Sequence, residues 1–142
     1  MFARNPLRTS TSLALLLAVL SVAWAPLEPA AAQYVSPEIT ISARDSAEYS
    51  PAIAYNPLHN QYLVVWENDW DGGYHDIYAQ RVSGSGQLLS WFALASGNSQ
   101  AEPAVAYDPV NDRYLVVWLH DARGDGSDWD VHGRFIPWYG PD

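Results

Sequence analysis

Two loops rich in Asp, Gly and aromatic residues contain the side chains best suited to ligand chemistry in this chain. They span residues 68–75 and 120–129, and each has one Trp among its carboxylates. A Trp ring can stack on the apolar side of a sugar while Asp and Arg bind its hydroxyl groups. This pattern predicts a carbohydrate-binding surface made of Trp70, Asp71, Tyr74, Arg123, Asp128 and Trp129.

The same loops admit two other interpretations. Closely spaced carboxylates with Gly for sharp turning suit calcium, and the candidate ligands are Asp125, Asp128 and Asp130. The EF-hand pattern D-x-[DN]-x-[DN]-G with a closing Glu is absent. The third interpretation is structural, because Asp and Gly are ordinary residues of hairpin loops. We favour the structural interpretation and expect no bound cofactor, with calcium as the lesser alternative.

Catalytic chemistry finds little support in the sequence. The chain has no Cys, and neither G-x-S-x-G nor H-E-x-x-H occurs. Its four His are distributed over several predicted loops and one strand. Two carboxylates could still meet in space as the acid–base pair of a glycosidase. We therefore expect a non-catalytic protein, and a glycan-hydrolysing enzyme is the alternative from another class.

An internal repeat organises the chain. Residues 50–66 and 102–118 align without a gap at an offset of 52, and the pattern PAxAYxPxxxxYLVVW is common to both. The similarity resumes after a loop, where residues 76–79 match residues 130–133 at an offset of 54. A period of this length is typical of repeat architectures such as propeller blades.

Each repeat is predicted to contain β-strands and no helix. The expected strands are 51–55, 61–67, 76–82 and 87–95 in the first unit, and 103–107, 113–119 and 130–136 in the second. Residues 62–66 (YLVVW) do not alternate between apolar and polar, so both faces of that strand should be buried. Antiparallel, four-stranded propeller-type blades meet this requirement, and a small β-sandwich is the alternative fold.

The repeated pattern, followed by an Asp- and Gly-rich loop and D-[IV]-x-[AG], resembles repeats of large secreted bacterial proteins. The resemblance covers residues 51–82 and 103–136 and implies a β-propeller, most often without an assigned activity. Those propellers have more blades than the two encoded here. The chain is therefore expected to be a fragment of a longer array, or a two-blade protomer like small bacterial lectins that trimerise.

The expected partners follow from this shortage of blades. A lone pair of units would leave blade faces in contact with water and sheet edges unpaired. We expect a homo-oligomer or further repeats of a parent chain, with a carbohydrate or protein ligand. A strand at residues 39–42 resembles the fourth strand of a unit and could complete the second unit, which otherwise covers about 103–136, whereas the first covers about 51–95.

The N-terminal residues predict export. Arg4 and Arg8 precede an apolar run over residues 13–25, and small residues at 30–32 form an A-x-A cleavage site. A signal peptide over residues 1–32 would leave a β-repeat domain at 33–142, secreted, periplasmic or on the cell surface. From residue 33 onward five Arg stand against fifteen Asp and Glu. Such acidity disfavours nucleic acid and anionic membranes as partners.

Overall fold

The computed structural model of the chain describes residues 35–70 and 73–141. The chain divides after Ser36, and every described strand belongs to the part from Pro37 onward. The predicted signal peptide at residues 1–32 lies outside the described residues. Over the described ranges, no helix has the length and apolarity needed to cross a membrane.

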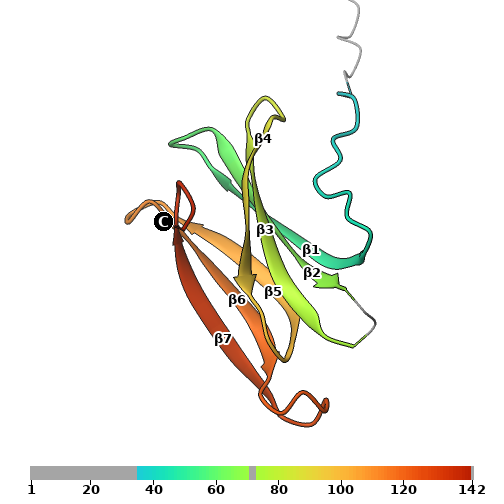
Figure 1. Cartoon of the computed structure of the whole chain (residues 1–142). Coiled ribbons are helices and arrows are strands. Elements are labelled where there is room, and N and C mark those ends of the chain that lie inside the picture. Colours follow the sequence, from blue (N-terminus) through green and yellow to red (C-terminus); the bar gives the residue numbers. More distant parts are fainter. Residues whose placement is uncertain (1–34, 71–72, 142) are drawn as a thin grey trace, which may run out of the picture. The chain divides into compact units, whose positions relative to one another are not determined.

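The described part of the chain is all-β, as predicted, and its antiparallel strands form two open sheets (Figure 1). Sheet 1 has the strand order β1-β2-β3-β4, and sheet 2 has the order β5-β6-β7. The strands are β1 (Ala47–Asn56), β2 (Gln61–Asp69), β3 (His75–Ser83), β4 (Leu88–Ala95), β5 (Ser99–Asp108), β6 (Arg113–Asp121) and β7 (Trp129–Pro137). Every predicted strand of the two units is present.

The first strand of each sheet begins earlier than predicted. A prediction that starts at Pro51 or Pro103 assumes that Pro, which has no N–H, ends the ladder. The pairing instead shifts between Tyr49 and Ala52, and again between Ala101 and Ala104. These are β-bulges, which leave an extra residue unpaired and let pairing resume beyond the Pro.

Asn56-Pro57 and Asp108-Pro109 begin the turns of the β-hairpins that follow the first strands, and the Asx side chain fixes both turns. The Asn56 Oδ1 atom accepts hydrogen bonds from the N–H groups of Leu58 and His59, at 2.9 and 3.1 Å. In sheet 2, Asp108 Oδ1 accepts in the same way from the N–H groups of Val110 and Asn111, at 3.0 and 3.2 Å. Side chains of Asn and Asp that bond their own backbone in this way fix the turn.

Each sheet has two faces at equivalent sequence positions, 52 residues apart in the second strand and 54 in the third. One face, called the leucine face, has Leu63, Val65, Ile77 and Ala79 in sheet 1 and Leu115, Val117, Val131 and Gly133 in sheet 2. The opposite face, called the tryptophan face, has Tyr62, Val64, Trp66 and Tyr78 in sheet 1 and Tyr114, Val116, Trp118 and His132 in sheet 2.

The two sheets stack front to back. The core joins Leu63, Val65, Ile77 and Ala79 of sheet 1 to Tyr114, Val116, Trp118 and Ile136 of sheet 2. The leucine face of sheet 1 therefore packs on the tryptophan face of sheet 2. This contact joins unlike faces, so the leucine face of sheet 2 and the tryptophan face of sheet 1 are left at the two ends of the stack.

The prediction that both faces of the YLVVW strand are buried is confirmed for the leucine face of β2 and only in part for its tryptophan face, where Tyr62 and Val64 are half-buried. For β6 the prediction is wrong for one face. In β2, Leu63 and Val65 are fully buried, and Trp66 on the opposite face is 4% exposed. In β6 the tryptophan face is buried, but Leu115 on the leucine face is 36% exposed. No part of the described chain covers this face, because the second sheet is the last one.

Residues 37–46, called the strap, do not form the strand expected at 39–42. The strap instead lies along the tryptophan face of sheet 1. Ile39 and Ile41 share a cleft with Tyr62, Val64 and Val82. The sequence resemblance to a fourth strand therefore does not lead to pairing with β7 within the single chain, and β7 remains an edge strand.

Candidate functional site

A groove between the two sheets is lined by the two His and the Arg of the tryptophan face of sheet 2. We call it the histidine groove, and its volume is about 340 Å³. Residues of β4 and of the turn after it form one wall. Its lining residues are Ala93, Leu94, Ala95, Ser96, Gln100, Trp118, His120, His132 and Arg134. None of these described lining residues is a carboxylate.

Strand alternation explains how the groove is assembled. Trp118 and His120 are two apart on β6, and His132 and Arg134 are two apart on β7, so each pair points to one face. The antiparallel register sets Trp118 opposite His132, which brings the rings of His120 and His132 to within 4.5 Å of each other. Gln100 enters from β5, which pairs with β6.

A hydrogen-bond chain selects the tautomer of the neutral His120 ring. The indole N–H of Trp118 donates to Gln100 Oε1 at 2.7 Å. The amide nitrogen of Gln100, which can only donate, then faces the Nδ1 atom of His120 at 2.8 Å. Nδ1 is therefore the acceptor, and the proton of the neutral ring is on Nε2, available as a donor.

Arg134 adds a fixed positive charge to the groove. Its guanidinium donates to the backbone oxygen of Leu94 at 2.8 Å, which leaves other N–H groups unused by that bond. Together with the Nε2–H of His120, these donors suit a ligand with hydrogen-bond acceptors, such as hydroxyl or carboxylate oxygens. Such a group would meet both donors in the groove, and none of the described lining residues is an activated nucleophile.

The predicted carbohydrate residues are divided among different surfaces. Trp70 packs edge-on against Tyr78 on the tryptophan face of sheet 1. Trp129 begins β7 two residues before Val131, so it lies on the same face as Val131, the leucine face of sheet 2. Arg123 and Asp128 form an exposed ion pair at 3.2 Å. Asp71 lies outside the described residues, and the carbohydrate surface stays a prediction.

Tyr74 of the first loop lies beside the second loop. Its ring is close to Gly124, beside the Asn98 side chain. Asn98 Nδ2 donates to the backbone oxygen of Ala122 at 2.9 Å. The loops after β2, β4 and β6 therefore meet at one end of the stack.

Two of the three predicted calcium residues, Asp125 and Asp128, are engaged by protein groups. Asp125 accepts hydrogen bonds from the N–H and the hydroxyl of Ser127, at 3.0 and 2.5 Å. Asp128 is paired with Arg123, and Asp130 is opposite His120 in the ladder. In the described part of the chain, no group of three or more His, Asp or Glu is placed to hold a metal ion.

Asp121, which the sequence did not single out, organises this loop. It is buried, and its two carboxylate oxygens accept from the N–H of Arg123 and of Gly126, at 3.2 and 2.6 Å. Burial tends to raise the pKa of Asp121, but these backbone donors outweigh burial and lower it. The loop carboxylate with the most backbone contacts is therefore structural.

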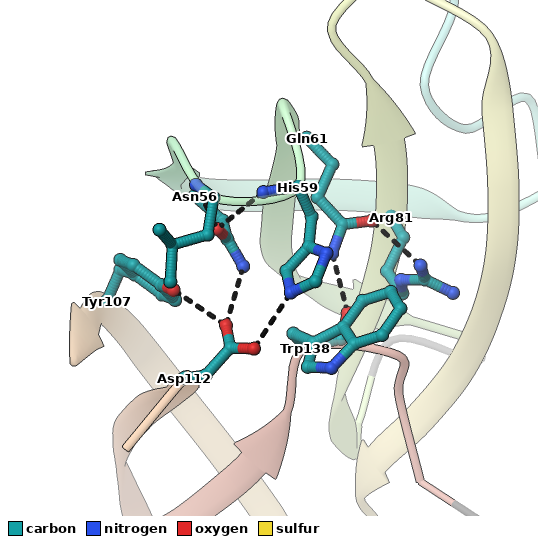
Figure 2. A network of polar contacts seen from close by, with 8 residues as sticks. Asn56, His59, Gln61, Arg81, Tyr107, Asp112 and Trp138 are labelled. Atoms are coloured by element: carbon teal, nitrogen blue, oxygen red, sulfur yellow. Dashed lines mark hydrogen bonds and ion pairs between the residues drawn. The ribbon is translucent and has the colours of Figure 1, made fainter. Parts of the chain in front are cut away.

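A second polar cluster joins the two sheets at the opposite turns, as Figure 2 shows. We call it the turn junction. Asp112 Oδ1 accepts from the Tyr107 hydroxyl at 2.7 Å and from Asn56 Nδ2 at 3.3 Å, while Oδ2 is 2.8 Å from His59 Nε2. The imidazole of His59 stacks on Trp138, with ring centroids 3.7 Å apart. One carboxylate of sheet 2 thus holds the first turn of sheet 1.

Electrostatics at the turn junction agree with an ionised Asp112. The hydrogen bond from Tyr107, and then those from His59 and Asn56, hold the pKa of Asp112 below its usual value. Partial burial and then the contact with this carboxylate raise the pKa of Tyr107 to about 12. Tyr107 therefore stays protonated and donates throughout the physiological range.

Arg81 and the C-terminal residues complete the turn junction. Arg81 donates to Gln61 Oε1 at 2.7 Å and to the backbone oxygen of Tyr139 at 2.9 Å. Gln61 Nε2 in turn donates to the backbone oxygen of Trp138 at 2.7 Å. These bonds fasten the residues after β7 to sheet 1, so the junction is structural in the single chain.

One further cluster brings two carboxylates to a histidine. His75 Nδ1 is 3.1 Å from Glu67 Oε2, and its Nε2 is 3.8 Å from an Asp69 oxygen. Glu67 is buried and its other oxygen accepts from the N–H of Glu102 across the sheets, at 2.7 Å. Burial raises the pKa of Glu67, but this backbone bond and the other donors outweigh it and lower the pKa. Both oxygens of Glu67 are engaged, which favours a structural role.

Sequence reasoning missed the histidine groove and the turn junction. A spacing of two residues separates Trp118 from His120 and His132 from Arg134. This spacing indicates that the two side chains of each pair lie on one face of their strand, and it could have pointed to the groove. Gln100 and the wall formed by β4 gave no comparable signal. The partnership of Asp112 with His59 spans 53 residues and needs the stacking of the sheets.

Comparison with known proteins does not assign this chain to a family. No family model, curated protein or solved structure matches this chain.

Proposed function

We propose that the chain is an exported, non-catalytic β-repeat module that functions by stacking on further units of the same kind. In this proposal the two sheets are propeller-type blades, and the module scaffolds or binds as part of a larger array. The observation that supports it is the front-to-back packing of the sheets.

Front-to-back contacts behave differently from symmetric ones. When like faces pack on each other, a pair is complete, whereas unlike faces leave a free face at each end and continue until a ring closes. Here the free leucine face is apolar, with Val131 75% and Phe135 50% exposed. A two-layer sandwich would be expected to have polar residues at these outward positions, so the blade interpretation is favoured.

The experiment compares two substitutions of the same chemistry in the chain from residue 33 onward. Val131→Asp places a charge on the free leucine face, and Val110→Asp places it on an exposed turn that is 87% accessible. Sedimentation velocity over a range of concentrations should show association for wild type and Val110→Asp. Val131→Asp should remain monomeric, because burying an unpaired carboxylate is costly. Equal association of both variants would refute the proposal.

The histidine groove supports a second function, namely binding of a ligand rich in acceptor oxygens. Its donors, Arg134 and His120, converge on a space of about 340 Å³ without a lining carboxylate. Titration with monosaccharides and with citrate, followed through the His120 and His132 ring protons by NMR, tests this function. Saturable shifts that His120→Ala weakens would support it, and unchanged spectra with both probes would refute it.

A further inference from the structure

The tryptophan face of sheet 1 is covered by a short irregular segment, although the same face of sheet 2 is covered by a whole sheet. The strap, residues 37–46, has no strand of its own. It leaves clefts of about 220, 170 and 230 Å³ between itself and sheet 1. Such clefts mark a loose fit, since protein interiors are normally close-packed.

One side chain attaches the strap to an aromatic cluster on sheet 1. The guanidinium of Arg44 lies over three aromatic rings, at 4.1 Å from the centroid of Trp91, 4.9 Å from Tyr78 and 5.3 Å from Trp70. Arg stacks favourably on aromatic faces, and three rings around one cation make an aromatic cage. Removing this one residue should therefore loosen the strap without touching the core.

The strap also changes a hydrogen bond that sheet 2 retains. In sheet 2 the Trp118 indole donates to Gln100, whose equivalent in sheet 1 is Glu48. Under the strap, Glu48 instead accepts from the Ser42 hydroxyl at 2.7 Å. The buried indole nitrogen of Trp66 has no hydrogen-bond partner in the described part of the chain. A buried donor without a partner is unfavourable, so the strapped state is less well satisfied than its counterpart.

We infer that the strap is a removable cover, which gives way to the free leucine face of a second copy of this chain. The molecule itself shows what this tryptophan face accepts, because Tyr114, Val116 and Trp118 of sheet 2 take the leucine face of sheet 1. The residues at the matching positions of sheet 1, Tyr62, Val64 and Trp66, are identical in type. The leucine face that would dock keeps Leu115 and Val117 in place of Leu63 and Val65.

The inference rests on the proposed stacking function and names its partner and its control. Within one chain the strap and a second copy compete for one surface. The affinity of association then depends on how much more tightly the second copy binds this surface than the strap does. Weakening the strap should therefore strengthen association.

The first experiment measures association of Arg44→Ala by sedimentation of the chain from residue 33 onward. Losing a guanidinium that three rings share should lower the midpoint concentration of association roughly tenfold. Arg44→Lys, which keeps the cation but loses the planar stacking group, should fall between wild type and Arg44→Ala. Arg123→Ala removes an equal charge from an exposed ion pair and is the matched control.

The second experiment follows the strap directly. The chain has no Cys, so Ala43→Cys gives a unique site for a spin label on an exposed strap residue. The label should be restricted in the dilute monomer and become mobile as the protein associates.

The outcomes separate the inference from the proposed function. An unchanged midpoint for Arg44→Ala, or a label equally restricted in monomer and oligomer, overturns the inference. If Val131→Asp still abolishes association in that case, the stacking function stands without the strap. If neither wild type nor Arg44→Ala associates, a second copy is not the partner and the inference is overturned.

Discussion

Leu63 and Leu115 occupy matching positions of the aligned segments 50–66 and 102–118, yet Leu63 is fully buried and Leu115 is 36% exposed. Leu63 faces sheet 2, whereas Leu115 faces the open end of the stack. Two residues of one type in one local pattern thus differ only in whether another sheet follows.

This difference predicts unequal costs of truncation. Leu63→Ala should lower the free energy of unfolding by about 2–5 kcal/mol, because it removes buried contacts and leaves a cavity. Leu115→Ala should cost about 1 kcal/mol or less in the monomer, where water already reaches the side chain. Urea unfolding at low protein concentration measures both. Similar losses would mean that the leucine face of sheet 2 is covered in solution.

The turn junction predicts a second pair of unequal substitutions. Asp112 and Asn60 are equivalent residues with similar positive φ values, 51° and 46°, so replacement by Ala changes the backbone alike. Asn60 accepts from Tyr55 within its own sheet, whereas Asp112 also bonds His59 and Asn56 across the sheets. Asp112→Ala should therefore lower the melting temperature more than Asn60→Ala. An equal loss would show that the inter-sheet bonds contribute nothing.

Acid should weaken the same junction. The pKa of Asp112 is lower in the folded chain than its ordinary value of 3.8. The stabilisation from this carboxylate is therefore complete above the ordinary value and disappears as pH falls through the folded pKa. Asp112→Asn cannot titrate, so its unfolding free energy should fall less than that of wild type between pH 5 and about pH 2. Parallel acid curves for the two proteins would contradict this assignment.

The histidine groove predicts a defined tautomer. His120 should show the Nε2–H form by NMR nitrogen shifts, since Gln100 donates to its Nδ1. Gln100→Ala should release this preference and cost about 1–3 kcal/mol, because the Trp118 indole loses its acceptor. His132→Ala is the matched control. The His132 ring lies in the same groove, is more exposed than that of His120 and takes no part in this hydrogen-bond chain, so the His120 tautomer should not change. A His120 tautomer that is unchanged in Gln100→Ala would exclude the hydrogen-bond chain.

The sequence by itself determined the local structure of this protein. The apolar pattern that recurs in the two copies located every strand of the two units, because such a pattern acts between near neighbours along the chain. The strands of the first copy were predicted as well as those of the second. Only the strand ends differed. The first strand of each sheet begins four residues earlier than predicted, beyond the bulges near Ser50 and Glu102, and the other ends differ by two residues or fewer.

Only the tertiary structure decided which surfaces are covered. The aligned segments have the same residues on the same strand faces, so no local pattern distinguishes Leu63 from Leu115. Nor does a local pattern predict that Asp112 contacts His59. The strap shows the same limit, because residues 39–42 have the pattern of a strand but lie on the tryptophan face of sheet 1. Burial depends on the neighbours that stacking supplies, and those neighbours lie 35 to 77 residues away in the hydrogen bonds that join the sheets.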